Sequence, residues 1–502
     1  MTNNIFAQAA NNSASMTFTE NGHPVASTTG DKLLDLYGQV GALRHQDEDR
    51  IRKLFDNAIQ EDKLLAAKIM FYARDARGGT GERWLFRRLL RYAADKYPEM
   101  VRPNLRLVAE YGRWDDLYCL VETSLEDEMF EVIGHQLSMD VSAAMRDEPV
   151  SLLAKWLPSC NASSKDTQEL GRLTCKKLGI KESLYRKTLS KLRARIKIVE
   201  AQMSANKWQD IQYDKIPSRA GMIYRKAFDR HDSERYADYI SSVMKGEKKI
   251  NAKMNTPQDL VHACYGHPED PTIEAMWKNL PDYVNSEENV LCMVDVSGSM
   301  YGRPIEVSTG LGMYFAQHNK GAFHNLFLTF ESSPRFCSLD DNLSFHDNLS
   351  NVFRAPWGGS TNLNLACESM LQFAVQNKVP QKDMPTRLLI ISDMEIDEAA
   401  GIGHYGWRSN LSSSEALHIN ELKQMYAEHG YSVPQVIYWN VDSRDNHFHT
   451  KSDIPGTMLA SGSSPAVFEA VMAMKDLEVT PYSAMLEVLN SERYAPITVS
   501  RA

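Results

Sequence analysis

Apolar positions in the first half of the chain recur at intervals of three or four residues. This spacing is the period of an amphipathic helix, and it repeats over Leu33 to Leu43, Ile51 to Ile59 and Leu65 to Tyr72. Helices of this kind cannot bury their apolar faces alone, so they predict a stacked, HEAT-like helical array over residues 31–285. A linear array leaves two apolar ends. We therefore expect this array to close into a ring, either on itself or on the domain that follows.

The second half shows a different pattern, in which short apolar runs alternate with helical stretches. Such alternation predicts a parallel sheet wrapped by helices, an α/β doubly wound domain over residues 286–502. Residues 1–30 are rich in Asn, Ser and Thr, so we expect a flexible N-terminal tail there. The strands of the α/β domain are expected near residues 290–294, 323–330, 387–391, 435–439 and 456–462.

The first of these strands ends in a polar turn that contains Asp295, Ser297 and Ser299. A buried parallel strand delivers its last side chains to the carboxyl edge of the sheet, so one carboxylate and two hydroxyls gather around one point. Such hard oxygen ligands suit a Mg²⁺ ion that keeps several of its waters. Two later stretches supply further oxygen ligands: a Gly-rich loop contains Thr361, and the strand that starts at Arg387 is expected to end in Asp393.

Together these residues resemble the metal-ion-dependent adhesion site of von Willebrand factor A domains. The resemblance implies a Rossmann-like fold and a site for Mg²⁺ or another divalent cation, with an acidic side chain of a protein partner at the open coordination position. It assigns the metal to Asp295, Ser297, Ser299, Thr361 and Asp393. One ion with hydroxyl ligands and no evident general base favours binding over catalysis, so we do not expect an enzyme. The alternative is a Ser/Thr-rich turn beside two ordinary strand-end aspartates.

The net charge of −9 argues against a nucleic-acid partner, but the charge is unevenly distributed. Residues 165–253 contain 22 Lys and Arg against 11 Asp and Glu, a local net charge of +11, while the rest of the chain holds 34 against 54. A sign asymmetry of this size indicates an anionic partner for the basic segment.

Basic and aromatic side chains are interleaved within this segment. Lys187, Lys191 and Arg195 recur at four-residue spacing on one face of a predicted helix, and Arg193 lies on another face. Phosphate neutralisation combined with base stacking on tyrosine is what single-stranded RNA binding requires. The alternative is a solvated basic face above core aromatics. The remaining RNA-binding candidates are Arg219, Tyr224, Arg225, Lys226, Arg230 and Tyr236.

Two motifs in the helical half, residues 73–83 and 111–117, resemble those of the Ro ribonucleoprotein (TROVE-type) family. The closer resemblance is to an uncharacterised sister family of plant, large-virus and phage proteins, which also joins helical repeats to an A domain. This resemblance implies a monomeric ring that holds non-coding or misfolded single-stranded RNA. It makes Arg74, Arg77 and Lys155 candidate RNA contacts. The alternative for the two arginines is structural, because Arg–Asp pairs at helix ends cap helices and tie repeats together.

Other chemistry has weaker support in the sequence. No apolar run approaches the roughly 20 residues that a membrane span needs, and no phosphate-binding Gly-x4-Gly-Lys-Ser/Thr loop is present. Seven scattered cysteines without a Cys-x-x-Cys pair indicate reduced thiols and a cytoplasmic protein. A second group of polar side chains near a late strand is either another metal site or a solvent-facing loop, and Glu395 and Asp397 either support the first site or are ordinary loop acids. The members of that second group are Asp442, Asp445, His447 and His449.

These patterns lead to one main functional hypothesis and one alternative. The main hypothesis is a Ro-like RNA-binding protein whose basic helical ring holds RNA, whose A domain binds a partner through Mg²⁺, and which does not associate with membranes. The alternative is a metal-dependent protein–protein scaffold that does not bind RNA.

Overall fold

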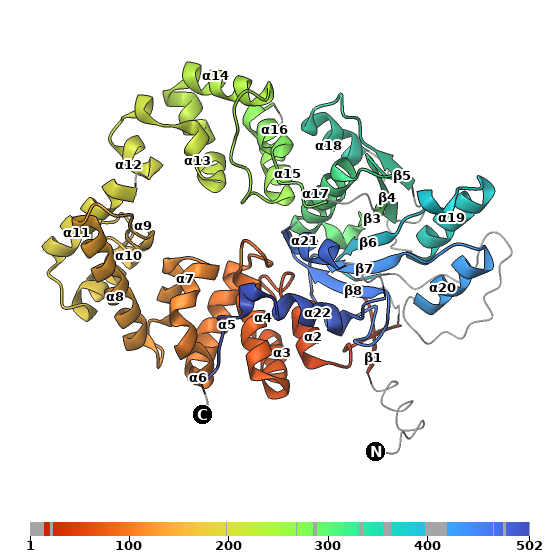
Figure 1. The fold of residues 1–502 in the computed structure, drawn as a ribbon, viewed down its shortest axis with the longest axis horizontal. Helices are drawn as coiled ribbons and strands as arrows, with labels where there is room; N and C mark the ends of the chain where they lie inside the picture. Colours follow the sequence, from red (N-terminus) through yellow and green to blue (C-terminus); the bar gives the residue numbers. More distant parts are fainter. Residues whose placement is uncertain are drawn as a thin grey trace.

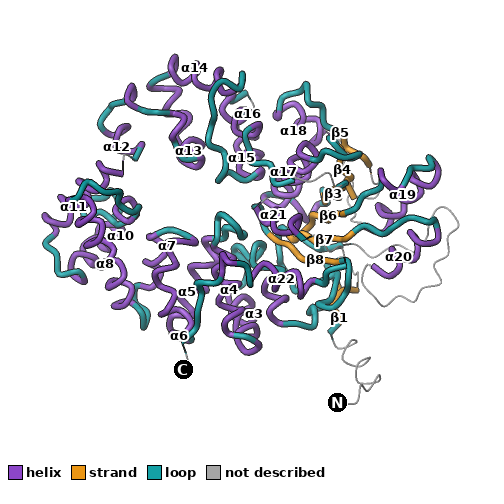
Figure 2. Tube along the Cα trace, in the orientation of Figure 1, coloured by secondary structure: helices purple, strands orange, loops and turns teal. Residues whose placement is uncertain are grey.

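An arc of helices and an α/β domain make up this chain, and the two ends of the arc meet that domain (Figure 1). The tube view distinguishes the two parts by their secondary structure, with helices around the arc and the strands of the six-stranded sheet gathered in the α/β domain (Figure 2). The computed structural model describes residues 15–20, 24–196, 198–267, 269–284, 289–330, 335–354, 363–396, 419–464, 466–474 and 478–500.

The arc follows the helical periodicity that the sequence predicts. Several of its helices begin at polar caps: Asp47 and Asp62 each accept a backbone N–H at the start of a helix, and Thr256 forms a capping box with Asp259. The helices of the arc are α2 (Lys32–Tyr37), α3 (Glu48–Glu61), α4 (Lys63–Arg74), α5 (Arg83–Lys96), α6 (Pro98–Val101), α7 (Val108–Tyr111), α8 (Glu126–Met145), α9 (Leu153–Trp156), α10 (Lys165–Lys177), α11 (Glu182–Ile196), α12 (Val199–Ser204), α13 (Ser218–His231), α14 (Ser233–Met244), α15 (Pro257–Gly266) and α16 (Pro271–Lys278).

Short 3-10 turns occur in both parts of the chain. They are η1 (Arg102–Leu107), η2 (Trp114–Leu120), η3 (Trp208–Asp210) and η4 (Tyr213–Lys215) in the arc, and η5 (Gly298–Met300), η6 (Gln381–Asp383) and η7 (Glu492–Tyr494) in the α/β domain.

The α/β domain contains a six-stranded sheet in the order β5-β4-β3-β6-β7-β8. All neighbouring strands are parallel except β4 and β5, an antiparallel edge pair whose second strand the sequence did not reveal. The strands are β3 (Val290–Asp295), β4 (Leu326–Phe330), β5 (Arg335–Ser338), β6 (Arg387–Ser392), β7 (Gln435–Asn440) and β8 (Thr457–Ser461). The helices are α17 (Arg303–His318), α18 (Phe345–Arg354), α19 (Leu363–Gln376), α20 (Ile419–Glu428), α21 (Ala466–Ala473) and α22 (Pro481–Leu489).

The two faces of the sheet belong to two different hydrophobic cores, because alternate side chains of a strand point to opposite faces. Met293 and Ile390 join the core that runs through α2 to α11, at the N-terminal end of the arc. Val294 and Ile391 join the core that includes Leu260 of α15, at the other end. Each end of the arc therefore shares a core with one face of the sheet, and the expected closure on the following domain is confirmed.

The chain termini reinforce this closure. Residues 16–18 and 24–26, which we expected to lie in a flexible tail, form the antiparallel strands β1 (Met16–Phe18) and β2 (Pro24–Ala26), and Ala26 pairs with Phe448 beyond β7. At the other end, residues after α22 return to the arc, where the Ser500 N–H donates to the Glu99 carbonyl at 3.0 Å. Figure 1 shows this last segment running from α22 past α4 towards α6.

Candidate functional site

The sheet brings two aspartates together at its carboxyl edge. Asp295 is the last residue of β3 and Asp393 directly follows β6, and these two strands are parallel neighbours. Every residue of both strands is buried, as the apolar runs in the sequence predicted. Because parallel strands end at the same edge, the two carboxylates meet, although 97 residues separate the ends of the strands.

Hydroxyl groups surround Asp295. Its Oδ1 accepts the backbone N–H of Ser297 at 2.9 Å, and its Oδ2 accepts the Ser392 hydroxyl at 2.5 Å. The Ser297 and Ser299 hydroxyl oxygens lie 3.0 Å apart. The structure thus brings together four of the five metal ligands that the sequence resemblance assigned. The fifth, Thr361, lies outside the described residues.

The electrostatics of this edge suit a divalent cation. Burial and, to a smaller extent, the charge of Asp393 together raise the pKa of Asp295 to about 7. Burial likewise raises the pKa of Asp393. Two adjacent buried carboxylates repel each other when ionised, and a cation between them removes that cost. Carboxylates with hydroxyl oxygens form a donor set that fits Mg²⁺.

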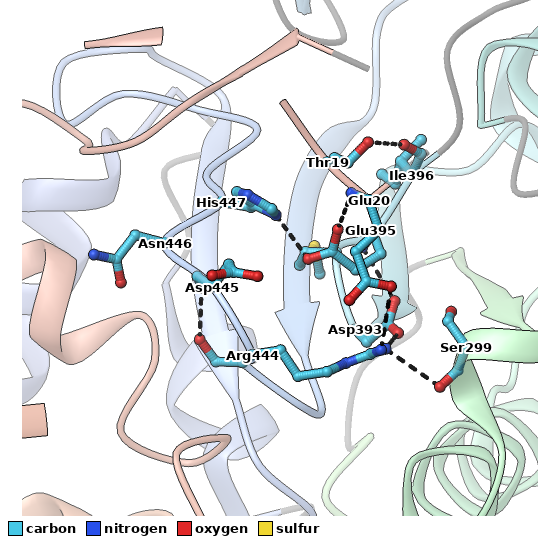
Figure 3. Close-up of polar contacts among 12 residues, drawn as sticks. Thr19, Glu20, Ser299, Asp393, Glu395, Ile396, Arg444, Asp445, Asn446 and His447 are labelled. Carbon is cyan, nitrogen blue, oxygen red and sulfur yellow. Dashed lines mark hydrogen bonds and ion pairs between the residues drawn. The ribbon is translucent and has the colours of Figure 1, made fainter. Parts of the chain in front are cut away.

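A cationic side chain that the sequence did not reveal already contacts Asp393. Arg444, in the loop after β7, forms an ion pair with the Asp393 carboxylate, and its Nη2 donates to the Ser299 carbonyl at 3.2 Å (Figure 3). Its Nη1 lies 3.5 Å from Glu20 of the N-terminal segment. The guanidinium therefore bridges both strand ends and the N-terminal segment, so a metal at Asp393 competes with an internal cation.

A second polar cluster lies beside this edge. Ligand atoms of Glu395, Asp445 and His447 all lie within 4.8 Å of one another, and His447 Nδ1 is 2.7 Å from Glu395 Oε1 (Figure 3). The N-terminal segment closes over this cluster, because the Glu20 N–H donates to Glu395 Oε2 at 2.8 Å. Glu395 therefore holds His447 and the N-terminal segment in place.

The other polar candidates near β7 have different positions. Asp442 accepts the side-chain amide of Gln46 at 2.9 Å, and His449 Nε2 lies 3.0 Å from the Met394 carbonyl. Of the four sequence candidates for a second metal, only Asp445 and His447 approach each other in the cluster above. Asp397 lies outside the described residues.

The basic segment divides into exposed cations and cations with protein partners. Lys187 and Lys191 on α11, and Lys226 and Arg230 on α13, are exposed and form no ion pair with the described residues. These four side chains are therefore available to an anionic ligand.

The other arginines that the sequence proposed as RNA contacts in this segment have structural partners. Arg195 pairs with Asp147 at 2.8 Å, Arg219 with Asp259 at 2.5 Å, and Arg225 with Asp270 at 2.7 Å. Arg225 is largely buried, so its pair with Asp270 ties α13 to the start of α16. Arg193 donates to the carbonyls of Ala154 and Leu157 and to the Ser159 hydroxyl.

The two candidate tyrosines differ in exposure. Tyr224 is half-buried, and its hydroxyl donates to Glu200 at 3.3 Å. Tyr236 is only 6% exposed and packs in the core of α12 to α14, with its hydroxyl 3.1 Å from that of Thr272. No base can stack on Tyr236 while this core is packed, so the expected stacking contact is limited to Tyr224.

The arginines of the Ro-like motifs hold helices together, as the structural alternative predicted. Arg74 is buried and pairs with Asp116 at 2.8 Å, and Arg87 pairs with the same carboxylate. Arg77 donates to the Glu110 carbonyl at 3.2 Å. Lys155 lies 3.5 Å from Glu200.

Comparisons with known proteins match both halves of the chain. Residues 19–139 and 167–289 match a domain of unknown function (DUF2828), and residues 289–494 match a second one (DUF7788). Uncharacterized protein L728 of Acanthamoeba polyphaga mimivirus is 27% identical over 535 residues, covering 97% of this chain and 89% of its own length. A crystal structure of the Deinococcus radiodurans Ro (RSR) protein covers 88% of this chain and 99% of its own, with a TM-score of 0.47 and 14% identity.

None of the helices in the described part of the chain has the length and apolar character to cross a membrane. The chain is thus similar, across both its helical arc and its α/β domain, to two domains of unknown function and to one viral protein of nearly the same extent.

Proposed function

We propose that this protein binds single-stranded RNA on the basic segment of its helical arc, residues 165–253. One observation carries the proposal: Lys187, Lys191, Lys226 and Arg230 are exposed on two helices and form no ion pair with the described residues. Uncompensated cations attract phosphate, and the half-buried ring of Tyr224 adds a surface on which a base can stack. The sequence resemblance to Ro-like proteins led to the same expectation.

The α/β domain has a separate role in this proposal. Asp295, Ser297, Ser299 and Asp393 would hold a divalent cation, which supplies an open coordination position for an acidic side chain of a protein partner. Within the protein, Ser392 and the Ser297 N–H orient Asp295 through hydrogen bonds. Arg444 balances the charge of Asp393.

Salt-dependent RNA binding tests the first part of this proposal. Fluorescence anisotropy would measure the affinity of the full chain for a labelled single-stranded RNA at several salt concentrations. Charge reversal at Lys187, Lys191 and Lys226 should weaken binding to many sequences alike. It should also flatten the slope of log K against log salt by about two units, since each phosphate contact on a single strand contributes about 0.7.

A matched control separates specific contacts from a change in net charge. Lys53, Lys378 and Lys382 are exposed outside the basic segment and form no ion pair with the described residues. Reversing these three charges changes the net charge by the same amount and should leave the slope unaltered. Equal losses of affinity in the two triple variants would contradict the proposed surface. The absence of any RNA binding by the parent protein would favour the scaffold alternative.

A further inference from the structure

A pocket of about 770 Å³ lies between α11, α12 and the loop that follows α9. This volume falls within the range of roughly 300–1,000 Å³ that is usual for small-ligand pockets. The pocket lies in the basic segment, on the stretch of the arc farthest along the ribbon from both contacts with the α/β domain (Figure 1).

The lining of this pocket is cationic. Arg186, Lys187 and Arg193 contribute to its wall, and none of the three pairs with a carboxylate of the described residues. The lining contains one acid, Glu200, which already accepts the Tyr224 hydroxyl and lies 3.5 Å from Lys155. The charge that the pocket presents to a ligand is therefore positive.

Arg193 adds a specific reason to expect an anion. Its side chain is half-buried, and this burial lowers the pKa of the guanidinium. Three of its five N–H groups donate to the Ala154 and Leu157 carbonyls and to the Ser159 hydroxyl, which holds the planar group in a fixed orientation. A half-buried cation that is held by neutral acceptors alone is stabilised by an anionic ligand, and its two remaining N–H groups can donate to the oxygens of a phosphate.

Neutral polar side chains complete the wall. Asn161, Ser183, Ser190 and Ser204 line the pocket, and their side chains form no hydrogen bond with the described residues. These groups donate and accept hydrogen bonds, as the ribose and base of a nucleotide also do. Leu189 and Ile198 add an apolar surface. The pocket thus combines cations, polar groups without a hydrogen-bond partner among the described residues, and apolar surface. This combination suits a nucleotide.

We propose that this pocket binds a terminal phosphomonoester nucleotide of single-stranded RNA. The inference rests on the proposed function, and it adds that a chain end with a phosphate binds better than the same chain with a hydroxyl end. A terminal phosphomonoester carries more charge than an internal diester and exposes three oxygens, so it gains more from the three cations of the pocket wall.

Three forms of one ten-nucleotide oligouridine test this inference on the full chain: one with a 5′-phosphate, one with a 3′-phosphate and one with hydroxyls at both ends. We expect one phosphorylated form to bind about tenfold more tightly than the hydroxyl form, an increase equivalent to one charge-assisted hydrogen bond. The form that shows the preference identifies which end of the RNA enters the pocket.

Two substitutions on the same helix provide the matched comparison. Lys187 lines the pocket, whereas Lys191 is an equally exposed lysine one turn further on and does not line it. Lys187→Ala and Arg186→Ala should abolish the preference for the phosphorylated end, while Lys191→Ala should weaken all three forms alike and keep the preference. Both lysines are exposed, so neither substitution is expected to unfold the helix.

The possible results separate this inference from the proposed function. Tight RNA binding without any end preference, or a preference that Lys187→Ala leaves intact, would overturn the pocket inference and leave RNA binding in place. Failure of all three forms to bind would overturn the proposed function. In that case, calorimetry with uridine 5′-monophosphate would test whether the pocket binds a nucleotide. Binding that depends on Lys187 would support a nucleotide site, and the absence of binding would overturn the pocket inference. Stronger binding of a phosphoserine peptide than of phosphorylated RNA would overturn the choice of RNA.

Discussion

At the scale of single residues, one side chain, that of Arg444, determines the charge balance of the candidate metal site. Its guanidinium pairs with the Asp393 carboxylate, which a metal would use, and also donates to the Ser299 carbonyl. A cation bound at this edge must displace these contacts before it can use the Asp393 carboxylate.

Arg444→Ala should therefore increase the affinity for Mg²⁺. Loss of a charge-assisted hydrogen bond to a buried carboxylate corresponds to about tenfold or more in affinity. Calorimetric titration of the metal into the parent and the variant would measure the change. Asp295→Asn should lose Mg²⁺ binding, and Arg52→Ala, far along the chain on α3, should leave it unaltered. A weaker affinity in Arg444→Ala would contradict competition.

The raised pKa of Asp31 predicts that the stability of the protein depends on pH. This residue caps α2, and burial raises its pKa from the ordinary 3.8 to about 6, with a further contribution from the charge of Glu61. The folded state thus holds a proton that the unfolded state has lost between about pH 4 and pH 6. The free energy of unfolding should fall as pH rises through this window.

Asp31→Asn keeps the capping oxygen and removes the titration. Relative to this variant, the parent should lose about 1 kcal/mol of stability between pH 4 and pH 6, a value that allows for partial exposure. Denaturant unfolding at the two pH values would measure the difference. An identical pH dependence in both proteins would show that Asp31 does not titrate in this window.

At the scale of secondary-structure elements, close backbone packing joins the arc to the sheet. The Gly41 N–H donates to the Ser461 hydroxyl at 2.9 Å at the end of β8. A Cβ at Gly41 would lie 2.3 Å from the Ser461 carbonyl oxygen, which is backbone and cannot move aside cheaply. Only glycine allows the segment after α2 to lie so close to β8.

Gly41→Ala should destabilise this junction by about 1–3 kcal/mol or more, because overpacking forces the backbone apart. Gly266→Ala is the matched control, since a Cβ there meets nothing within 4 Å. Thermal unfolding of both variants would test the contrast. The prediction fails if both alanine variants melt at the temperature of the parent.

At the scale of the whole molecule, the C-terminal segment closes the ring. Asp75 of the arc is fully buried and forms an ion pair with Arg493, while the Tyr494 hydroxyl lies within hydrogen-bond distance of two acceptors, Asp75 at 3.1 Å and the Gly78 carbonyl at 3.2 Å. These contacts join residues more than 400 positions apart. They connect the end of the α/β domain to the break between α4 and α5.

Arg493→Ala should leave the Asp75 carboxylate buried without its cation and destabilise the protein by about 3 kcal/mol. Arg52→Ala, which breaks an exposed pair with Glu48, should cost less than about 1 kcal/mol. Chemical denaturation would compare the two, and limited proteolysis would show whether the C-terminal segment has loosened. Similar losses in the two variants would argue against a closing role for Arg493.

Much of the architecture could be predicted from local patterns in the sequence. Apolar runs identified β3 and β6, and the three-to-four spacing identified α2, α3 and α4 of the arc, because both patterns record which side of an element is buried. The position of Asp295, Ser297 and Asp393 at one sheet edge also followed, since parallel neighbours end at the same edge.

Tertiary structure alone decided which charged and aromatic residues are available to a ligand. Arg444 reaches Asp393 from 51 positions away, and Asp270 neutralises Arg225 from 45 positions away. Tyr236 has an aromatic ring of the kind on which bases stack, yet this ring packs in a hydrophobic core. Sequence determined the elements because periodicity is a local property of the chain. Ion pairs and burial depend on which distant segments meet, so the fold determined which of the candidate groups remained free.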